Sequence, residues 1–240
     1  MKKIIAVIGS PNYDRSNTVC LTSDFLQEVK NIDPEVEYEV ISLGAQDIKP
    51  CQGCWACMKL GHCVIKDDLA AIQAKLLASD LVIFGSPVYA HQVSGQMKTF
   101  IDRMFIWIHT MKLMGIPALS ATTTAQTGTT AVQRSLQNTL CMMGAVPVGK
   151  LRGIAYRPGT FPRRDMFRLK HLPLAKKVVG ILQGRKRPMA TLMNHVYFHG
   201  LQISYQKKAE HLPYEHQYWT AKRWFGCGFG QARKRERAGG

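Results

Sequence analysis

The chain has 240 residues and carries 32 lysines and arginines against 16 aspartates and glutamates, a formal net charge of +16 at pH 7. With 46 % hydrophobic residues it can bury a full core, in one domain with an appendage or in two small ones. No stretch of about 18 uncharged apolar residues occurs, which argues against a transmembrane helix, and the apolar stretch after Lys2 and Lys3 is too short for a signal peptide. We therefore expect a cytoplasmic protein without a membrane span.

The first 150 residues alternate between strand-like and helix-like segments. The segments with strand character are Lys3–Ile8, Val36–Ile41, Leu81–Phe84, Ile116–Thr122 and Val146–Ile154. The helical segments are Asn17–Lys30, a helix capped by Asp67 and Asp68 that runs to about Ala78, Ser94–His109 and Thr130–Met143. This alternation predicts an α/β fold with a doubly wound, five-stranded parallel sheet, covered by helices on both faces.

The pattern is weaker beyond Arg157. Phe167–Leu182 is predicted as a fifth helix, although Pro173 should break or kink it. Gly184–Pro188 is typical of a linker, and the residues after it include a helical pattern over Met189–Gly200. We therefore divide the chain into a first domain, residues 1–183, and a basic aromatic extension, residues 184–240, whose last ten residues are expected to fray.

The positive charge lies almost entirely in the last 90 residues. Residues 151–240 carry 19 basic and 4 acidic side chains, a net of +15, whereas residues 1–150 carry 13 and 12, a net of +1. This asymmetry favours an acidic partner, an anionic cofactor or a nucleic acid, and a solvated basic surface explains it equally well.

Four cysteines lie within thirteen residues, inside a predicted loop over residues 48–66. They are Cys51, Cys54, Cys57 and Cys63, with the spacing C-x2-C-x2-C-x5-C. A backbone that curls around one centre would let them hold an iron–sulfur cluster, whose irons take four cysteine thiolates. Three alternatives stay open: structural zinc, which usually takes two separated C-x2-C pairs, a disulfide pair, and free thiols. The final gap of five residues also differs from the x3-C-P ending of bacterial ferredoxins.

Polar residues follow the first predicted strand and lead into the first helix. Free backbone N–H groups at a helix N-terminus, together with the helix dipole, favour a dianionic phosphate there. Arg15 lies in the same loop and can neutralise such a charge. The side chains that can add hydrogen bonds are those of Ser10, Ser16, Asn17 and Thr18. Neither G-x-x-x-x-G-K-[ST] nor G-x-G-x-x-G occurs, so the motifs of nucleoside triphosphatases and of Rossmann dinucleotide sites are missing.

Two more small, polar loops leave the third and fourth strands. They are Gly85–Tyr89 and Ala121–Gly128. In a doubly wound sheet these loops meet the first one at the carboxyl ends of the strands, where ligands bind. We expect a flat ring between the three loops, with Tyr89 against or near its face.

Three segments resemble the NAD(P)H-dependent FMN reductase branch of the flavodoxin-like proteins: GSPNYDRSNT, PCQGCWAC with the following CVIKDDL, and GSPVYAHQVSGQMKTFIDR. The cysteine run narrows the resemblance to the iron–sulfur flavoproteins, and the similarity covers roughly residues 1–155. It implies a flavodoxin-like fold with five strands in the order 2-1-3-4-5. It also implies an FMN phosphate bound by Ser10, Asn12, Ser16, Asn17 and Thr18. It implies a flavin ring surrounded by Ser86, Pro87, Val88 and Tyr89, with looser contacts from Thr122, Thr123 and Gly128. It also implies a [4Fe–4S] cluster on Cys51, Cys54, Cys57 and Cys63, and a dimer or tetramer with each flavin near a subunit boundary.

Several side chains outside these motifs have predicted roles. Asp102 and Arg103 are expected to form a structural ion pair or an interface contact, and Trp55 to shield a cluster from water. His91, which follows Tyr89 closely, could reach the flavin, but we favour a position on the surface. The aromatic residues of the extension are Tyr214, Tyr218, Trp219, Trp224, Phe225 and Phe229. Interleaved with basic residues they can bind single-stranded nucleic acid, but we favour an aromatic arm that packs across a neighbouring subunit near its flavin.

The predicted function is that of an electron-transfer flavoprotein. A one-electron donor, such as an acidic ferredoxin attracted to the basic half, would reduce the cluster, and FMN would then reduce a small-molecule acceptor. The alternative is an NAD(P)H-dependent FMN or quinone reductase without a cluster. A third hypothesis, a nucleic-acid or partner-binding module that uses the basic extension, ranks below both because of the flavin-site motifs.

Overall fold

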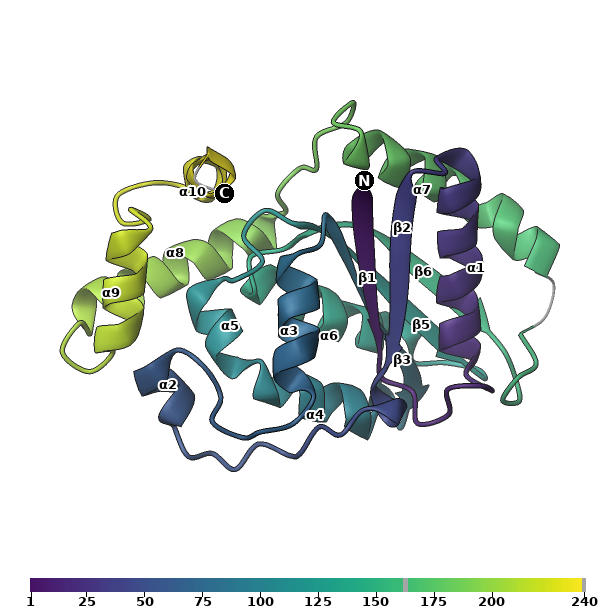
Figure 1. The fold of residues 1–240 in the computed structure, drawn as a ribbon, viewed down its shortest axis with the longest axis horizontal. Coiled ribbons are helices and arrows are strands. Elements are labelled where there is room, and N and C mark those ends of the chain that lie inside the picture. The colour runs from purple at the N-terminus through teal and green to yellow at the C-terminus, as the bar shows by residue number, and fades with distance from the viewer. Residues whose placement is uncertain (162–163, 239–240) are drawn as a thin grey trace.

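Five parallel strands form the centre of the structure, a computed structural model that describes residues 1–161 and 164–238 (Figure 1). The strands are β1 (Lys2–Ile8), β2 (Val36–Ser42), β3 (Leu81–Tyr89), β5 (Pro117–Thr124) and β6 (Val146–Ile154). Their order is β2-β1-β3-β5-β6, which confirms the predicted flavodoxin-like order of five parallel strands. A two-residue strand, β4 (Gln92–Val93), was not predicted and pairs antiparallel with the end of β3.

Helices cover both faces of this sheet. Helices α1 (Asn17–Ile32) and α7 (Arg164–Leu182) lie on one face, and α3 (Leu69–Leu77), α4 (Gly95–Arg103) and α6 (Thr129–Met142) lie on the other (Figure 1). Each layer buries its own apolar cluster against the strands. The continuous apolar runs of β1 and β3 therefore meet helices on both sides, as expected for a parallel sheet.

Pro173 was predicted to break or kink α7, and it lies inside the helix without ending it, so the predicted break is wrong. A proline at this position removes the hydrogen bond to the carbonyl of the residue four positions earlier, Leu169. Leu169 is 71 % exposed, so water can reach the carbonyl that the proline leaves unpaired. The helix therefore continues through the proline.

The helix predicted over Ser94–His109 is two helices, α4 and α5 (Phe105–Thr110). Met104 separates them, and its N–H group is shared between the carbonyls of Phe100 and Ile101. This local tightening changes the direction of the chain. The change places Phe105 beside the cysteine-rich loop, which contains the short helix α2 (Ala56–Leu60).

The cap of α3 also differs from the prediction. Asp67 Oδ1 accepts a hydrogen bond from Leu69 N at 3.2 Å, whereas Asp68 Oδ2 accepts one from Asp47 N at 2.8 Å. Asp68 occupies the N-cap position, but its side chain makes no capping hydrogen bond. Asp67 therefore caps the helix, and Asp68 fixes the loop that follows β2.

The extension folds as three helices, α8 (Leu192–Lys207), α9 (Pro213–Ala221) and α10 (Phe229–Ala238). The tail expected to fray is helical through Ala238, and Gly239 and Gly240 lie outside the described residues. Figure 1 shows α9 beside α5 and α2 and α10 beside α8, all of them away from α1.

We expected the aromatic residues of the extension to pack across a neighbouring subunit. For the largest of these side chains, the two tryptophans, this expectation is wrong. Trp219 and Trp224 are fully buried within the chain itself, in a third apolar cluster that also contains Met111 and Val146 of the first domain. Trp219 Nε1 donates a hydrogen bond to His109 O at 3.0 Å, so the buried indole is satisfied within the chain as well.

Within the described ranges, no helix has the length and apolar character needed to cross a membrane.

Candidate functional site

A cleft of about 180 Å³ opens at the carboxyl ends of β1, β3, β5 and β6. One loop from each strand contributes to its wall, because parallel strands of one sheet end at the same edge. The lining residues are Ser10, Asn12, Arg15, Ser16, Asn17, Thr18, Pro87, Val88, Tyr89, Thr123, Thr124, Ala125, Ala155, Tyr156, Arg157 and Pro158.

The loop after β1 is fixed from two sides. Gly9 N donates a hydrogen bond to Gly85 O at 2.7 Å, and Ser94 Oγ at the start of α4 donates to Gly9 O. A Cβ atom at Gly9 would lie 2.4 Å from Met97 Cβ, so α4 can approach this closely only because residue 9 is glycine. The loop is therefore held in place by the neighbouring strand and by α4.

The amino end of α1 faces the cleft. Ser16 is its N-cap, and the Ser16 Oγ atom accepts a hydrogen bond from Val19 N at 3.1 Å. The unpaired N–H groups of the first turn and the positive end of the helix dipole attract anions. Arg15 and Arg157 add two positive charges, and the described lining of the cleft contains no carboxylate. This end of the cleft is suited to a phosphate group.

Hydrogen bonds join the loops around the cleft. Thr18 Oγ1 lies 2.6 Å from Thr123 Oγ1, which connects α1 to the end of β5. Asn17 Nδ2 donates to Arg157 O at 2.8 Å, which connects α1 to the loop after β6. Asn17 Oδ1 is buried, and no described residue donates a hydrogen bond to it. A ligand hydroxyl group would supply the missing donor.

Nine of the twelve predicted flavin-site residues line this cleft: Ser10, Asn12, Ser16, Asn17, Thr18, Pro87, Val88, Tyr89 and Thr123. The other three lie behind it. Ser86 is fully buried and bonded to Pro87 O at 2.7 Å, and Thr122 is buried on the opposite side of β5 from Thr123. Gly128 begins α6, where a Cβ atom would lie 2.7 Å from the Val88 side chain.

The sequence reasoning missed the contribution of the loop after β6. Ala155, Tyr156, Arg157 and Pro158 all line the cleft. The rule that predicted the other loops, that ligands bind at the carboxyl ends of parallel strands, applies equally to β6. It would have identified these residues too.

A tight hairpin carries Tyr89. Ala90 and His91 have φ angles of +48° and +62°, a region that favours glycine, between the paired ends of β3 and β4. His91 is exposed, as predicted, and His91 Nε2 lies 3.3 Å from Thr127 Oγ1. Tyr89 is 48 % exposed at the rim of the cleft. The strained turn therefore holds an aromatic ring beside the space where a ligand would lie.

The four clustered cysteines line a second cavity, of about 390 Å³. The loop around it contains three residues with positive φ, Gly53 at +64°, Trp55 at +59° and Gly61 at +77°, which curl the backbone as predicted. Trp55 is 62 % exposed, and its ring lies 6.5 Å from that of Phe105, which closes another side of the cavity. Within the described part of the chain, no three histidine, cysteine, aspartate or glutamate side chains converge to hold a single metal ion. The four thiols therefore line a cavity and do not converge on a single point.

The thiols of this cavity influence one another. Burial raises the pKa of the Cys57 thiol, and its neighbours Cys63, Cys51 and Cys54 raise it further. Four thiolates at this site would repel one another, and a positively charged metal centre would offset that repulsion. The donor set and the cavity therefore fit a polynuclear cluster with four thiolate ligands.

A buried ion pair closes the cysteine loop. Arg103 Nη1 lies 2.5 Å from Asp67 Oδ2, and both side chains have no exposed area. Lys49 N donates to the same Asp67 oxygen at 3.0 Å, and Arg103 Nη1 donates to Lys49 O at 2.6 Å. The two ends of the loop are thereby joined. The predicted pair between Asp102 and Arg103 is wrong, because Asp102 pairs with Lys98 at 2.6 Å.

Arg103 also faces the thiols. Burial alone would lower the pKa of its guanidinium, but the hydrogen bonds with Asp67 and Cys63 outweigh burial and raise it above its ordinary value. Burial would likewise raise the pKa of Asp67, and the hydrogen bonds from Arg103, Lys49 and Leu69 together lower it. Both groups are therefore charged at pH 7. Arg103 Nε is buried, and no described residue accepts a hydrogen bond from it.

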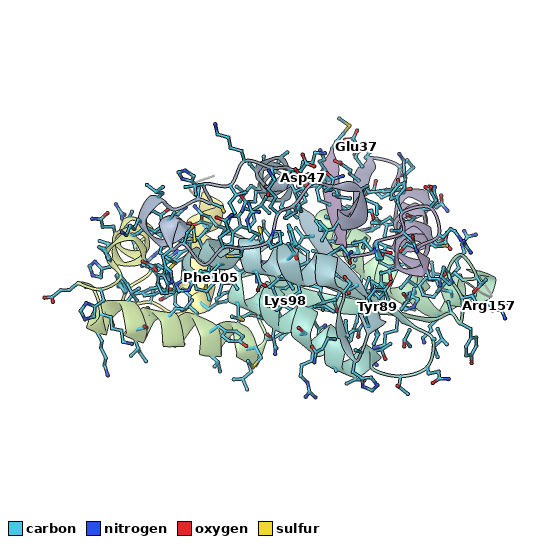
Figure 2. The ribbon with its side chains drawn as sticks, turned by 90° about the horizontal axis from the view of Figure 1, so that it is seen from below. Glu37, Asp47, Tyr89, Lys98, Phe105 and Arg157 are labelled. Carbon is cyan, nitrogen blue, oxygen red and sulfur yellow. The ribbon has the colours of Figure 1, made fainter. Side chains whose placement is uncertain are left out.

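Helix α4 connects the two sites. Its N-cap residue, Ser94, is bonded to the loop of the first cleft, and its last residue, Arg103, lines the cysteine cavity. Nine helical residues span about 13 Å. In Figure 2, Lys98 of α4 lies between Tyr89 and Phe105, and Arg157 lies beyond Tyr89 on the far side from Phe105.

Comparison with known proteins identifies the family. The family model described as NADPH-dependent FMN reductase matches residues 2–156. The chain belongs to this family. It is therefore a flavin-dependent oxidoreductase with a flavodoxin-like fold, and the predicted family resemblance is confirmed.

Relatives and solved structures agree with this assignment. An iron–sulfur flavoprotein of Archaeoglobus fulgidus is 33 % identical over 171 residues, which covers 71 % of this chain and 76 % of the relative. An iron–sulfur flavoprotein of Methanocaldococcus jannaschii is 39 % identical over 101 residues, or 42 % of this chain and 51 % of the relative. The structure of a WrbA-like flavodoxin from Agrobacterium tumefaciens aligns with a TM-score of 0.51 at 14 % identity, over 78 % of this chain and all of that one. The last comparison bears on the fold alone.

The first cleft fits the cofactor of an FMN reductase. A dianionic phosphate would meet Arg15, Arg157 and the amino end of α1. The hydroxyl groups of a ribityl chain would reach the unpaired Asn17 Oδ1 atom. Tyr89 and Val88 provide apolar surface for a flat ring.

Proposed function

We propose that this FMN reductase family member is an iron–sulfur flavoprotein that passes electrons between a [4Fe–4S] cluster and FMN to a small-molecule acceptor. One observation carries the proposal: the four cysteines line a single cavity at one end of α4, and the other end of that helix is bonded to the loop of the flavin cleft. When bound, the cluster supplies single electrons, and FMN can store one or two of them.

The chain's own residues would hold and separate the two groups. Cys51, Cys54, Cys57 and Cys63 would be the thiolate ligands. Arg103, buried beside them, would offset part of the negative charge of a thiolate-ligated centre and would donate its unpaired Nε–H group. The apolar side chains that line this cavity, including Ile101 and Phe105, would limit the access of water to that centre.

Purification without air tests the proposal. We expect a brown protein whose spectrum contains flavin bands and broad cluster absorption, with iron and inorganic sulfide in stoichiometric amounts. Cys54→Ser should lose iron and sulfide and keep the flavin, because Cys54 does not line the flavin cleft. Cys20→Ser is the matched control, because Cys20 lies outside the cysteine cavity. A purely yellow wild-type protein that takes up no iron under reducing conditions would refute the cluster.

The electron donor that we propose is an acidic one-electron carrier such as a ferredoxin. The net charge of +15 in residues 151–240 supports this choice, because opposite charge accelerates encounter between proteins. The rate of reduction should therefore fall steeply as the salt concentration rises. A rate that is independent of salt would contradict this part of the proposal.

A second candidate is an NAD(P)H-dependent FMN or quinone reductase that works without the cluster. The description of the matching family, which names NADPH, favours it. In this case NADPH alone should bleach the flavin rapidly, and Cys54→Ser should retain full activity. Slow bleaching together with loss of activity in Cys54→Ser would exclude this candidate.

We also propose that the chain forms a dimer or tetramer with the flavin cleft near a subunit boundary. Tyr89 and Tyr156, which are 48 % and 75 % exposed at the rim of the cleft, support this arrangement. Light scattering after size-exclusion chromatography tests it, and a monomer at micromolar concentration would contradict it.

A further inference from the structure

Helix α8 exposes a row of apolar side chains along its outer face. Leu192 is 76 % exposed, and Val196 and Ile203 are each 52 % exposed. Spacings of four and seven residues place these three side chains, the α8 stripe, on one side of the helix. In Figure 2, α8 is the pale yellow-green helix along the outer edge of the molecule below Phe105. The α8 stripe therefore faces away from the rest of the chain.

The inner face of α8 is fixed to the rest of the chain. Phe198 and Tyr205 are buried in the third apolar cluster. Asn194, which forms a capping box with Thr191 at the start of α8, donates a hydrogen bond from Nδ2 to Ala145 O at 2.8 Å. The helix cannot turn its outer face inward without breaking these contacts. Since a helix with apolar residues on both faces is normally covered on both, the α8 stripe calls for an occupant.

Basic side chains lie at both ends of the α8 stripe. Residues 183–209 contain five of them and no aspartate or glutamate, a net charge of +5. All five are exposed, and none forms an ion pair with a described residue. Three precede the helix and two lie at its end: Arg185, Lys186, Arg187, Lys207 and Lys208. The apolar row therefore lies between two clusters of uncompensated positive charge.

The elements packed against α8 do not supply the missing negative charge. They are α6, α9 and α10. Helix α6 contains no acidic residue and carries the exposed Arg134. The carboxylate of α9, Glu215, is buried, and that of α10, Glu236, is paired with Lys222 at 2.5 Å. This side of the molecule therefore attracts anions.

We propose that the α8 stripe docks on the surface of a membrane that contains anionic lipids, without crossing it. The apolar side chains enter the boundary between headgroups and acyl chains, and the basic side chains at both ends of the stripe meet lipid phosphates. This contact goes beyond the proposed electron transfer and requires neither of its cofactors.

Two other occupants match these observations less closely. A second copy of the chain would bring clusters of like charge together, which opposes association. An acidic protein matches the charge, but the centres of protein–protein interfaces are rich in tryptophan, tyrosine and arginine, whereas the centre of the α8 stripe is aliphatic. A lipid surface matches both the charge and the aliphatic row.

Sedimentation of the full, cofactor-loaded chain with lipid vesicles tests the proposal. Vesicles of phosphatidylcholine alone are compared with vesicles in which about a third of the lipid is phosphatidylglycerol. We expect the anionic vesicles to bind at least about tenfold more tightly, and the difference to shrink as the salt concentration rises. Ile203→Ser should weaken binding by about fivefold through lost apolar burial, and Lys207→Gln by about fivefold through lost charge.

Two matched variants serve as controls. Leu169→Ser removes a leucine of α7 that is 71 % exposed, and Lys30→Gln removes an exposed lysine of α1. Both helices pack on the face of the sheet opposite to α6, against which α8 lies. Each control should therefore bind the anionic vesicles as the wild type does.

Three results would overturn the proposal. The first is binding that does not distinguish the two kinds of vesicle, and the second is binding that Ile203→Ser and Lys207→Gln leave unchanged. The third is an absence of vesicle binding together with a dimer, or a complex with an acidic protein such as a ferredoxin, that Ile203→Ser dissociates in size-exclusion chromatography. Ile203 and Lys207 are exposed and line neither the flavin cleft nor the cysteine cavity, so both variants should keep their flavin and iron. Failure of the membrane contact is thereby distinguishable from failure of the proposed function.

Discussion

Removal of the Asp67 carboxylate should open the loop that carries the cysteines. Asp67 accepts hydrogen bonds from Arg103 Nη1 at 2.5 Å, Arg103 Nη2 at 3.2 Å, Lys49 N at 3.0 Å and Leu69 N at 3.2 Å. Asp67→Ala leaves a fully buried guanidinium without its counter-ion and frees one end of the loop. Breaking a buried pair in this way costs about 3–5 kcal/mol of unfolding free energy.

Urea unfolding followed by circular dichroism measures this loss, and the reaction rate of the thiols with a disulfide reagent reports the opening of the loop. Asp102→Asn is the control, because the exposed pair of Asp102 with Lys98 should contribute no more than about 0.5 kcal/mol. A loss of less than about 1 kcal/mol in Asp67→Ala, with unchanged thiol reactivity, would refute the reasoning.

The ion pair between Asp67 and Arg103 should also make the unfolding free energy depend on pH, in a direction that the pKa shift of Asp67 determines. The pKa of Asp67 in the folded protein lies below its ordinary value, because the hydrogen bonds from Arg103, Lys49 and Leu69 outweigh burial. Its contribution is therefore complete above the unfolded pKa of about 3.9 and is lost as the pH falls through the lower, folded value. The stability difference between wild type and Asp67→Asn should narrow below about pH 4. A difference that stays constant down to pH 2 would contradict this assignment.

Three further predictions concern the cleft and the extension. Gly9→Ala should prevent flavin retention, because its Cβ would lie 2.4 Å from Met97 Cβ and displace the loop; a yellow variant with normal flavin content would contradict this. Arg157→Ala should weaken FMN binding more than riboflavin binding, as measured by fluorescence titration, and an equal effect on both would show that the arginine does not meet the phosphate. Trp219→Ala should lower the unfolding free energy by about 3–5 kcal/mol, because the indole is fully buried, and a loss below about 1 kcal/mol would mean that the extension is not part of the core.

The sheet was predictable because its strands are continuous apolar runs. Val146–Ile154 was predicted with the bounds that β6 has, and the alternation with helices predicted that the strands are parallel. Their order came from the flavodoxin-like resemblance. The break at Met104 was not predictable from periodicity, because apolar residues continue through α4 and α5. The break depends on where the chain must turn to pass the cysteine loop, which is a tertiary constraint.

Much of the flavin site was predictable because its loops follow strand ends. Thr122 and Thr123 could not be told apart from composition, since the one that faces the cleft is set by the register of β5 against β3 and β6. The side chains that close the cysteine loop could not be predicted from the sequence either. Asp67 and Arg103 lie 36 positions apart and meet only because α3 and α4 cover the same face of the sheet.

The packing of the extension determines which of the two sites, the cysteine cavity or the flavin cleft, lies beside its basic residues. Tyr214 of α9 packs so closely on the cysteine loop that a Cβ atom at Gly61 would lie 2.0 Å from its hydroxyl oxygen. Glu215 is buried in the same helix, 3.3 Å from His109 Nδ1 of α5, which fixes the extension beside the cysteine cavity. Figure 1 shows α9 beside α2 and far from α1. An acidic donor that docks on the extension beside α9 would therefore meet the cysteine cavity before the flavin cleft, whereas one attracted to the basic residues of α7 would dock on the α1 side of the sheet.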